Sequence, residues 1–298
     1  MRSLTRGVAL VVLSVSSALA QSRSGVVRLV DAELPYEIHG SGAPVVFIHG
    51  YTQNMSIWDD QMPFFAPKYR VIRYDVRGFG RSTGHVDPTT NAADLATLLD
   101  SLRIPSATVV GLSMGSDVAL NFAVNNPQRV RALVLYGAPP TQDFPIAPPP
   151  ELTALFQSFP EIVRKHGLDS LRKSLFASDL AWSPPNRPDI DAKLAKAWQG
   201  YTARELTDPR PLSNRVPPTR VAQINDVRVP VLVIHGDHEL AWFRQFDDTL
   251  MARLPNAQRV IIANGGHGAH FAQPEAFNRA VLAFLDRVSP SGQQVRRP

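Results

Sequence analysis

The chain has 298 residues, of which 44% are hydrophobic and 19% are charged, so it can bury the core of one large domain or two smaller ones. It contains no cysteine, which excludes disulfides, thiolate nucleophiles and thiolate metal ligands. The net charge of +5 is spread along the chain rather than clustered, which argues against a nucleic-acid partner.

The first twenty residues differ from the rest of the chain. Arg2 and Arg6 precede a short apolar run that ends in the sequence Ala-Leu-Ala at positions 18–20. This pattern is typical of a secretory signal peptide, and the run is too short for a good membrane span, although an anchor helix is the alternative. We therefore predict a signal peptide over residues 1–20, export to the periplasm or the medium, and no stable membrane insertion.

The next part of the chain alternates between strand and helix patterns. Strands are predicted where apolar and β-branched residues run together, and helices where apolar residues recur every three to four positions. The predicted strands are 26–32, 34–40, 45–50, 70–78, 107–110 and 130–137, and the predicted helices are 56–66, 92–102 and 116–126. This alternation indicates an α/β fold, with a mostly parallel sheet flanked by helices.

The alternation stops at Pro139. From there to about residue 218, short clusters of prolines surround helical stretches such as residues 170–182. An insertion of this kind between sheet strands is most simply a helical cap over one end of the sheet. Beyond the insertion the pattern returns, with strands at 229–236 and 259–263 and helices at 243–254 and 274–288.

The predicted organisation therefore has four parts. The core comprises residues 21–138 and 219–290, and the cap, residues 139–218, is inserted after the sixth strand. Residues 1–20 form the signal peptide. The polar tail, residues 291–298, is expected to be disordered.

The pentapeptide Gly111-Leu112-Ser113-Met114-Gly115 lies between a predicted strand and a predicted helix. By itself the G-x-S-x-G pattern is a weak signal, because a purely structural turn can have the same sequence. Between a strand and a helix, however, such a serine stands above the carboxyl edge of the sheet, where the helix dipole and the next amide favour negative charge. We interpret Ser113 as a nucleophile.

A serine nucleophile needs a base, and histidine is the side chain with a suitable pKa. His267 and His270 are the candidates in the glycine-rich loop before the last predicted helix. The other histidines of the chain are His39, His49, His85, His166, His235 and His238. His39 and His166 are placed at surface or cap positions.

Five segments resemble the successive landmarks of the α/β-hydrolase fold. They are VVFIHGYTQNMSIWDDQ, RYDVRGFGRS, VVGLSMGSDVAL, VPVLVIHGDHELAWF and ANGGHGAHFAQPEAFNRAVLAFL, and they cover nearly all of the chain after residue 20 except the cap. Their order is far more specific than any one of them. The chain is most similar to the branch of small-molecule esterases, enol-lactonases and related hydrolases.

The resemblance implies a role for each residue of the site. Ser113 is the nucleophile, His267 is the base, and the backbone amides of Tyr51 and Met114 form the oxyanion hole. His49 shapes its loop and transfers no proton. The matched turn of Asp75, Arg77, Gly78, Gly80 and Ser82 is interpreted as scaffold.

The acid departs from the family pattern. The family usually has an aspartate where this chain has Glu239, and Asp237 lies two residues earlier. Glutamate can orient a histidine if its extra methylene is accommodated, so we assign Glu239 as the acid and keep Asp237 as the alternative. The other acid position known in the fold holds Gly137-Ala138-Pro139, which contains no carboxylate.

Two other classes of function are alternatives. A metallohydrolase could use imidazole and carboxylate ligands from the set His235, Asp237, His238, His267 and His270. Their spacing matches no known zinc signature, however, and a metal site leaves the Ser113 motif unexplained. A non-catalytic binding protein has no need of nucleophile, base and acid together.

The sequence therefore predicts a serine hydrolase that cleaves small to medium carboxylic esters or lactones through an acyl-enzyme, with no cofactor and no metal. A C–C hydrolase, a perhydrolase or a thioesterase on the same scaffold is the alternative, because these enzymes share the triad and differ in the pocket. The substrate and the oligomeric state are left open. No role is assigned to the aromatic residues of the cap, Phe156, Phe159, Phe176, Trp182, Trp198 and Tyr201.

Overall fold

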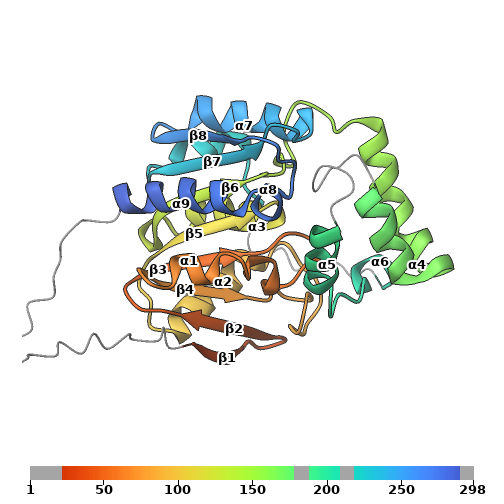
Figure 1. The fold of residues 1–298 in the computed structure, drawn as a ribbon, viewed down its shortest axis with the longest axis horizontal. Helices are drawn as coiled ribbons and strands as arrows, with labels where there is room; N and C mark the ends of the chain where they lie inside the picture. Colours follow the sequence, from red (N-terminus) through yellow and green to blue (C-terminus); the bar gives the residue numbers. More distant parts are fainter. Residues whose placement is uncertain (1–21, 178–187, 209–217, 289–298) are drawn as a thin grey trace, which may run out of the picture.

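The computed structural model describes residues 22–177, 188–208 and 218–288. Its centre is an eight-stranded sheet with the strand order β1-β2-β4-β3-β5-β6-β7-β8 (Figure 1). β1 and β2 pair antiparallel, as do β2 and β4, and every later pair is parallel. The predicted α/β class with a mostly parallel sheet is confirmed.

Burial on both faces explains the apolar character of the central strands. Every residue of β5 and of β7 is buried, because helices cover both faces of a parallel sheet. The strands are β1 (Arg23–Arg28), β2 (Glu33–His39), β3 (Ala43–Ile48), β4 (Tyr69–Tyr74), β5 (Ala107–Leu112), β6 (Val130–Tyr136), β7 (Val231–Gly236) and β8 (Ala257–Ile262).

The helices join successive strands and close the two faces of the sheet. They are α1 (Met62–Phe65), α2 (Asn91–Ser101), α3 (Met114–Asn125), α4 (Pro150–Ala177), α5 (Pro188–Ala197), α6 (Arg204–Thr207), α7 (Ala241–Arg253), α8 (Ala269–Ala272) and α9 (Pro274–Val288), with 3-10 turns η1 (Met55–Trp58), η2 (Pro127–Arg129) and η3 (Val221–Asp226). Among the described residues, no helix has the length and apolar character needed to cross a membrane.

The single helix predicted over residues 56–66 is wrong. The structure has the 3-10 turn η1 and the short helix α1 there, separated by three residues that are not helical. Asn54 begins η1, where its side chain accepts a hydrogen bond from the Ser56 amide at 2.8 Å. Pro63 favours a new helix start because it fits the first turn, and Pro67 follows the end of α1.

The insertion between β6 and β7 is helical in its described part. Figure 1 shows α4, α5 and α6 gathered beyond one end of the sheet. α4 is broken at Gly167, whose φ of 79° is outside the helical range. The limits of the cap stay a prediction, while the predicted signal peptide and tail lie outside the described residues.

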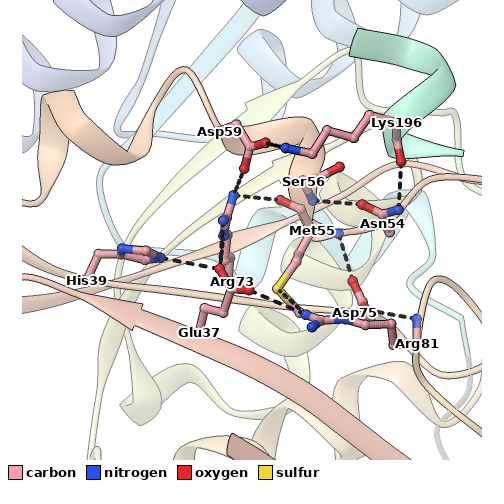
Figure 2. Close-up of polar contacts among 10 residues, drawn as sticks. All are labelled: Glu37, His39, Asn54, Met55, Ser56, Asp59, Arg73, Asp75, Arg81 and Lys196. Carbon is pink, nitrogen blue, oxygen red and sulfur yellow. Dashed lines mark hydrogen bonds and ion pairs between the residues drawn. The ribbon is translucent and has the colours of Figure 1, made fainter. Parts of the chain in front are cut away.

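Charged and polar side chains support the loop between β3 and α1 (Figure 2). Arg73 of β4 is largely buried and donates to Glu37 Oε2 at 2.6 Å and to Asp59 Oδ1 at 2.5 Å. Asp75, just after β4, accepts hydrogen bonds from the Met55 amide at 2.8 Å and the Arg81 amide at 2.9 Å. These contacts fix the loop to β4, in keeping with the scaffold role inferred for Asp75.

The same loop is also bound to the insertion. The Asn54 side-chain amide donates to the backbone oxygens of Lys196 at 3.1 Å and Gln199 at 2.9 Å. Lys196 Nζ in turn pairs with Asp59 Oδ2 at 2.6 Å, as Figure 2 shows. The position of α5 and the conformation of this loop are therefore coupled.

Arg77 and Asp94 form a buried ion pair that fixes the turn after β4. Arg77 Nε and Nη2 donate to the two Asp94 oxygens at 2.7 and 2.9 Å, and the side chains are 2% and 7% exposed. Removing one partner leaves an uncompensated buried charge, so we expect Asp94→Ala to lower the free energy of unfolding in urea by about 3–5 kcal/mol.

Asp31 supplies the control for this prediction. It also pairs with Arg77, at 2.8 Å, but its side chain is 51% exposed. Exposed pairs contribute little, so Asp31→Ala should lower the free energy of unfolding by less than about 1 kcal/mol. Equal losses in the two variants would contradict the assignment of the buried pair as the stabilising one.

Candidate active site

Ser113 occupies a strained turn between β5 and α3. Its φ of 51° and ψ of −117° are unfavourable for a residue with a side chain, and such strain persists only where the surroundings enforce it. The flanking glycines show why the turn is tight: a Cβ at Gly111 would lie 2.2 Å from the Gly115 oxygen, and a Cβ at Gly115 would lie 2.4 Å from the Ile48 oxygen. The strand and helix can meet only because both positions lack side chains.

His267 lies in the loop between β8 and α8, where it is 7% exposed. The Tyr136 hydroxyl donates to the His267 backbone oxygen at 2.7 Å and fixes the loop. The Phe243 ring packs against the imidazole with centroids 4.8 Å apart. The imidazole of His267 therefore packs against α7, while β6 anchors its backbone.

Glu239 is the carboxylate that meets His267. It follows β7, is 3% exposed, and places Oε2 2.8 Å from His267 Nδ1 while Oε1 accepts from the Leu240 amide at 3.0 Å. Because a carboxylate can only accept here, Nδ1 carries the proton and Nε2 keeps its lone pair. The geometry thus favours Glu239 over Asp237 as the acid that orients His267.

Asp237 has different partners. Its two oxygens accept from the backbone amides of Asn264 at 3.0 Å and Gly265 at 3.1 Å. These hydrogen bonds, that from Asn264 first, hold the pKa of the Asp237 carboxyl below its usual value. Asp237 therefore braces the loop that leads to His267 and does not contact the imidazole.

Gly137 explains how the longer glutamate is accommodated. A Cβ at this position would lie 2.7 Å from His267 Cε1, 2.8 Å from His267 Nδ1 and 3.3 Å from Glu239 Oε2. The missing side chain leaves the space that the His267–Glu239 pair occupies. The sequence showed that this position holds no acid, but it did not show that a glycine is required.

The loop after β3 brings a second amide to the nucleophile. A Cβ at Gly50 would lie 3.5 Å from the Ser113 Cβ, and Tyr51 follows directly. Within the described residues, neither the Tyr51 amide nor the Met114 amide is bonded to a protein acceptor. Both residues line the same cavity as Ser113.

His49 shapes this loop from within the core. Its Nε2 accepts from the Val76 amide at 2.9 Å, so its Nδ1 carries the proton and donates to the Gly50 oxygen at 2.8 Å. Burial lowers the pKa of the His49 imidazole, which favours the neutral ring. These contacts agree with the structural role that the resemblance implied.

A cavity of about 400 Å³ opens beside Ser113. Its walls come from the Ser113 turn, the loop after β6, the start of α7 and α4, and they include Tyr51, Met114, Pro139, Phe156, Trp242 and Phe243. Of the other cap aromatics, Phe159, Trp198 and Tyr201 are buried, and the side chains of Phe176 and Trp182 lie outside the described residues.

One contact that the sequence did not indicate joins the insertion to the Tyr51 loop. The hydroxyls of Tyr51 and Tyr201 donate to Glu205 Oε1 at 2.5 and 2.6 Å. Burial, with the nearby Glu205 charge, raises the pKa of the Tyr51 hydroxyl. Tyr51 and Glu205 are 154 positions apart in the chain, and no motif connects them.

The histidines and carboxylate of the metal hypothesis are not brought together. His235 Nδ1 lies 2.6 Å from Asp247 in the core, and burial raises the pKa of the Asp247 carboxyl to about 6. His238 is 64% exposed, whereas His270 is buried among aromatic rings. Within the described ranges, no three His, Asp or Glu side chains are placed to hold a metal ion.

Comparison with known proteins agrees with this architecture. A family model described as alpha/beta hydrolase fold matches residues 43–274. A candidate carbamate hydrolase, RutD, of Caulobacter sp. (strain K31) is 30% identical to this chain over 266 residues, which cover 85% of this chain and 95% of the relative.

Two further proteins are similar over most of their length. The 2-hydroxy-6-oxononadienedioate/2-hydroxy-6-oxononatrienedioate hydrolase 2 of Pseudomonas putida is 30% identical over 285 residues, covering 91% of this chain and 96% of the relative. The solved structure of a thermophilic esterase from Thermogutta terrifontis shares 25% identity with a TM-score of 0.73, covering 90% of this chain and 99% of that one.

Proposed function

Because the chain belongs to the α/β-hydrolase fold family, we propose that it is a serine hydrolase that cleaves small to medium carboxylic esters or lactones. One observation carries the proposal. A serine on a strained turn faces the same cavity as two unbonded backbone amides, while a buried His267–Glu239 pair lies beside that cavity. Nucleophile, base, acid and anion-binding amides are the parts that acyl transfer requires.

Each group has one task in the proposed reaction. Ser113 Oγ attacks the carbonyl carbon as His267 Nε2 accepts its proton, and Glu239 stabilises the imidazolium through Nδ1. The Tyr51 and Met114 amides stabilise the oxyanion. His267 then protonates the leaving group, and water activated by His267 hydrolyses the acyl-enzyme.

The pocket favours esters over the substrates of the C–C hydrolase relative. The name of the Pseudomonas putida relative describes dienedioates, which carry two carboxylates. The described lining of the cavity contains the carboxylate of Asp117 and no Lys, Arg or His. The Asp117 carboxylate would repel a carboxylate of the substrate, so a neutral ester or lactone fits this cavity better than a dienedioate does.

A substrate panel tests this proposal. We expect the purified protein to hydrolyse p-nitrophenyl esters of short and medium acids, or lactones, faster than thioesters or dienedioate C–C substrates, and to keep this activity after exhaustive chelation. Chelation is harmless to a serine mechanism because no step uses a metal. Activity that disappears with the chelator and returns with zinc would contradict the proposal.

A further inference from the structure

The cavity beside Ser113 contains a carboxylate that the proposed reaction does not use. Asp117 lies in the first turn of α3, four residues after Ser113, and both residues line the same cavity. Within the described part of the chain, no side chain or backbone amide donates a hydrogen bond to the Asp117 carboxylate, and no cation pairs with it. The side chain is only partly buried, so the carboxylate is open to the cavity that it lines.

Among the described residues, the surroundings of Asp117 leave its charge uncompensated. Burial alone raises the pKa of the Asp117 carboxyl to about 6, so the group is mostly ionised at pH 7 and above. Tyr51 is the other ionisable residue in the described lining, and its hydroxyl already donates to Glu205. Within the described lining, a ligand that enters the cavity therefore meets a negative charge without a counter-ion.

Aromatic rings line the same cavity. Tyr51, Phe156, Trp242 and Phe243 all contribute to its wall. The Trp242 indole is fixed by a hydrogen bond from Nε1 to the Ile146 oxygen at 2.9 Å and by the Phe243 ring, with centroids 5.5 Å apart. Ring faces together with an unpaired carboxylate attract organic cations, which are weakly hydrated and bind aromatic surfaces.

We propose that Asp117 and the aromatic wall form a subsite for an organic cation, so that the enzyme prefers esters carrying a quaternary or protonated amine. This inference rests on the proposed function, because it assumes that the cavity receives the ester attacked by Ser113. Ser113 directly precedes α3 and Asp117 lies in the first turn of that helix, so the cation would lie a few bonds from the reacting carbonyl. Asp117 would then determine specificity without taking part in the chemistry.

Binding to an inactive variant tests the subsite without any turnover. Choline and its neutral isostere 3,3-dimethylbutan-1-ol are titrated calorimetrically into Ser113→Ala. We expect choline to bind about tenfold tighter or more, and this preference to disappear in Ser113→Ala/Asp117→Asn. Asp248→Asn in the Ser113→Ala background is the matched control, because it removes one negative charge from a side chain that is 68% exposed and absent from the cavity wall.

Turnover provides a second readout. Choline esters are compared with 3,3-dimethylbutyl esters of the same acid, and 4-(trimethylammonio)butanoate esters with 5,5-dimethylhexanoate esters of the same alcohol. Asp117→Asn should lower the cationic-to-neutral ratio of kcat/KM by about tenfold or more in at least one pair.

The outcomes separate the two proposals. Equal binding of the two alcohols to Ser113→Ala, or a preference that survives Asp117→Asn, overturns the cation subsite. A preference for choline that depends on Asp117, in a protein that hydrolyses none of the esters, supports the subsite and contradicts the proposed function.

Discussion

Ser113→Ala is expected to lower kcat on a good ester by about five to six orders of magnitude, because it removes the atom that forms the acyl-enzyme. The residual rate would come from the amides of Tyr51 and Met114 and from substrate binding alone. Steady-state kinetics of the folded variant on one ester measures the loss. A variant that keeps more than about one per cent of the activity would contradict the assignment of the nucleophile.

Ser116 provides the control for this substitution. It lies three residues later in α3 and is fully buried, and its hydroxyl donates to the Gly111 oxygen at 2.7 Å and accepts from the Tyr136 amide at 3.0 Å. Its role is to hold the turn, so Ser116→Ala should lower stability by about 1–3 kcal/mol while keeping kcat within about tenfold of the parent. A comparison of the two variants thus separates loss of the nucleophile from loss of the fold.

Glu239→Gln is expected to lower kcat by about two to four orders of magnitude. The amide keeps the shape of the side chain, but it loses the charge that stabilises the imidazolium and can reverse the tautomer of His267. Asp237→Asn should have a much smaller effect, because its carboxylate contacts the Asn264 and Gly265 amides and not the imidazole. The same ester and the same assay serve both variants.

This pair of variants also decides between the two acids that the sequence left open. A large loss of kcat in Asp237→Asn, with a nearly normal kcat in Glu239→Gln, would show that the acid is Asp237. Thermal unfolding of both proteins shows whether a loss of activity reflects loss of the carboxylate or loss of the loop.

The sequence was sufficient for the features that depend on local pattern. The apolar runs of the central strands predicted a mostly parallel sheet, and the ordered motifs predicted the α/β-hydrolase fold; both are confirmed. The turn at Ser113 follows from two glycines and a strand-to-helix context, which are visible within a few residues. Such signals need no knowledge of distant contacts.

Features that depend on packing between distant segments were harder to predict. Asp237 and Glu239 both follow β7, and only the position of the 264–267 loop decides which carboxylate reaches His267. The helix predicted over 56–66 is wrong because Asn54 and Pro63 divide it into two turns. Helix propensity alone does not show that these local contacts outweigh the helical spacing of the apolar residues.

No pattern in the sequence predicted the contacts between the insertion and the site. Glu205 bonds to Tyr51 across 154 positions, and the Asn54 side chain bonds to the Lys196 oxygen across 142. The sequence places Asp117 close after Ser113 at the start of a predicted helix, but the aromatic wall around it depends on how α4 and α7 approach the sheet. The substrate preference therefore requires the three-dimensional structure.

The nucleophile is tested most directly by covalent labelling. The purified protein is treated with a fluorophosphonate, digested and analysed by mass spectrometry, with and without a chelator. The account predicts one adduct, located on Ser113, formed equally in both conditions and absent from Ser113→Ala. An adduct on another residue, or ester hydrolysis that continues at full rate after complete reaction with the probe, would contradict it.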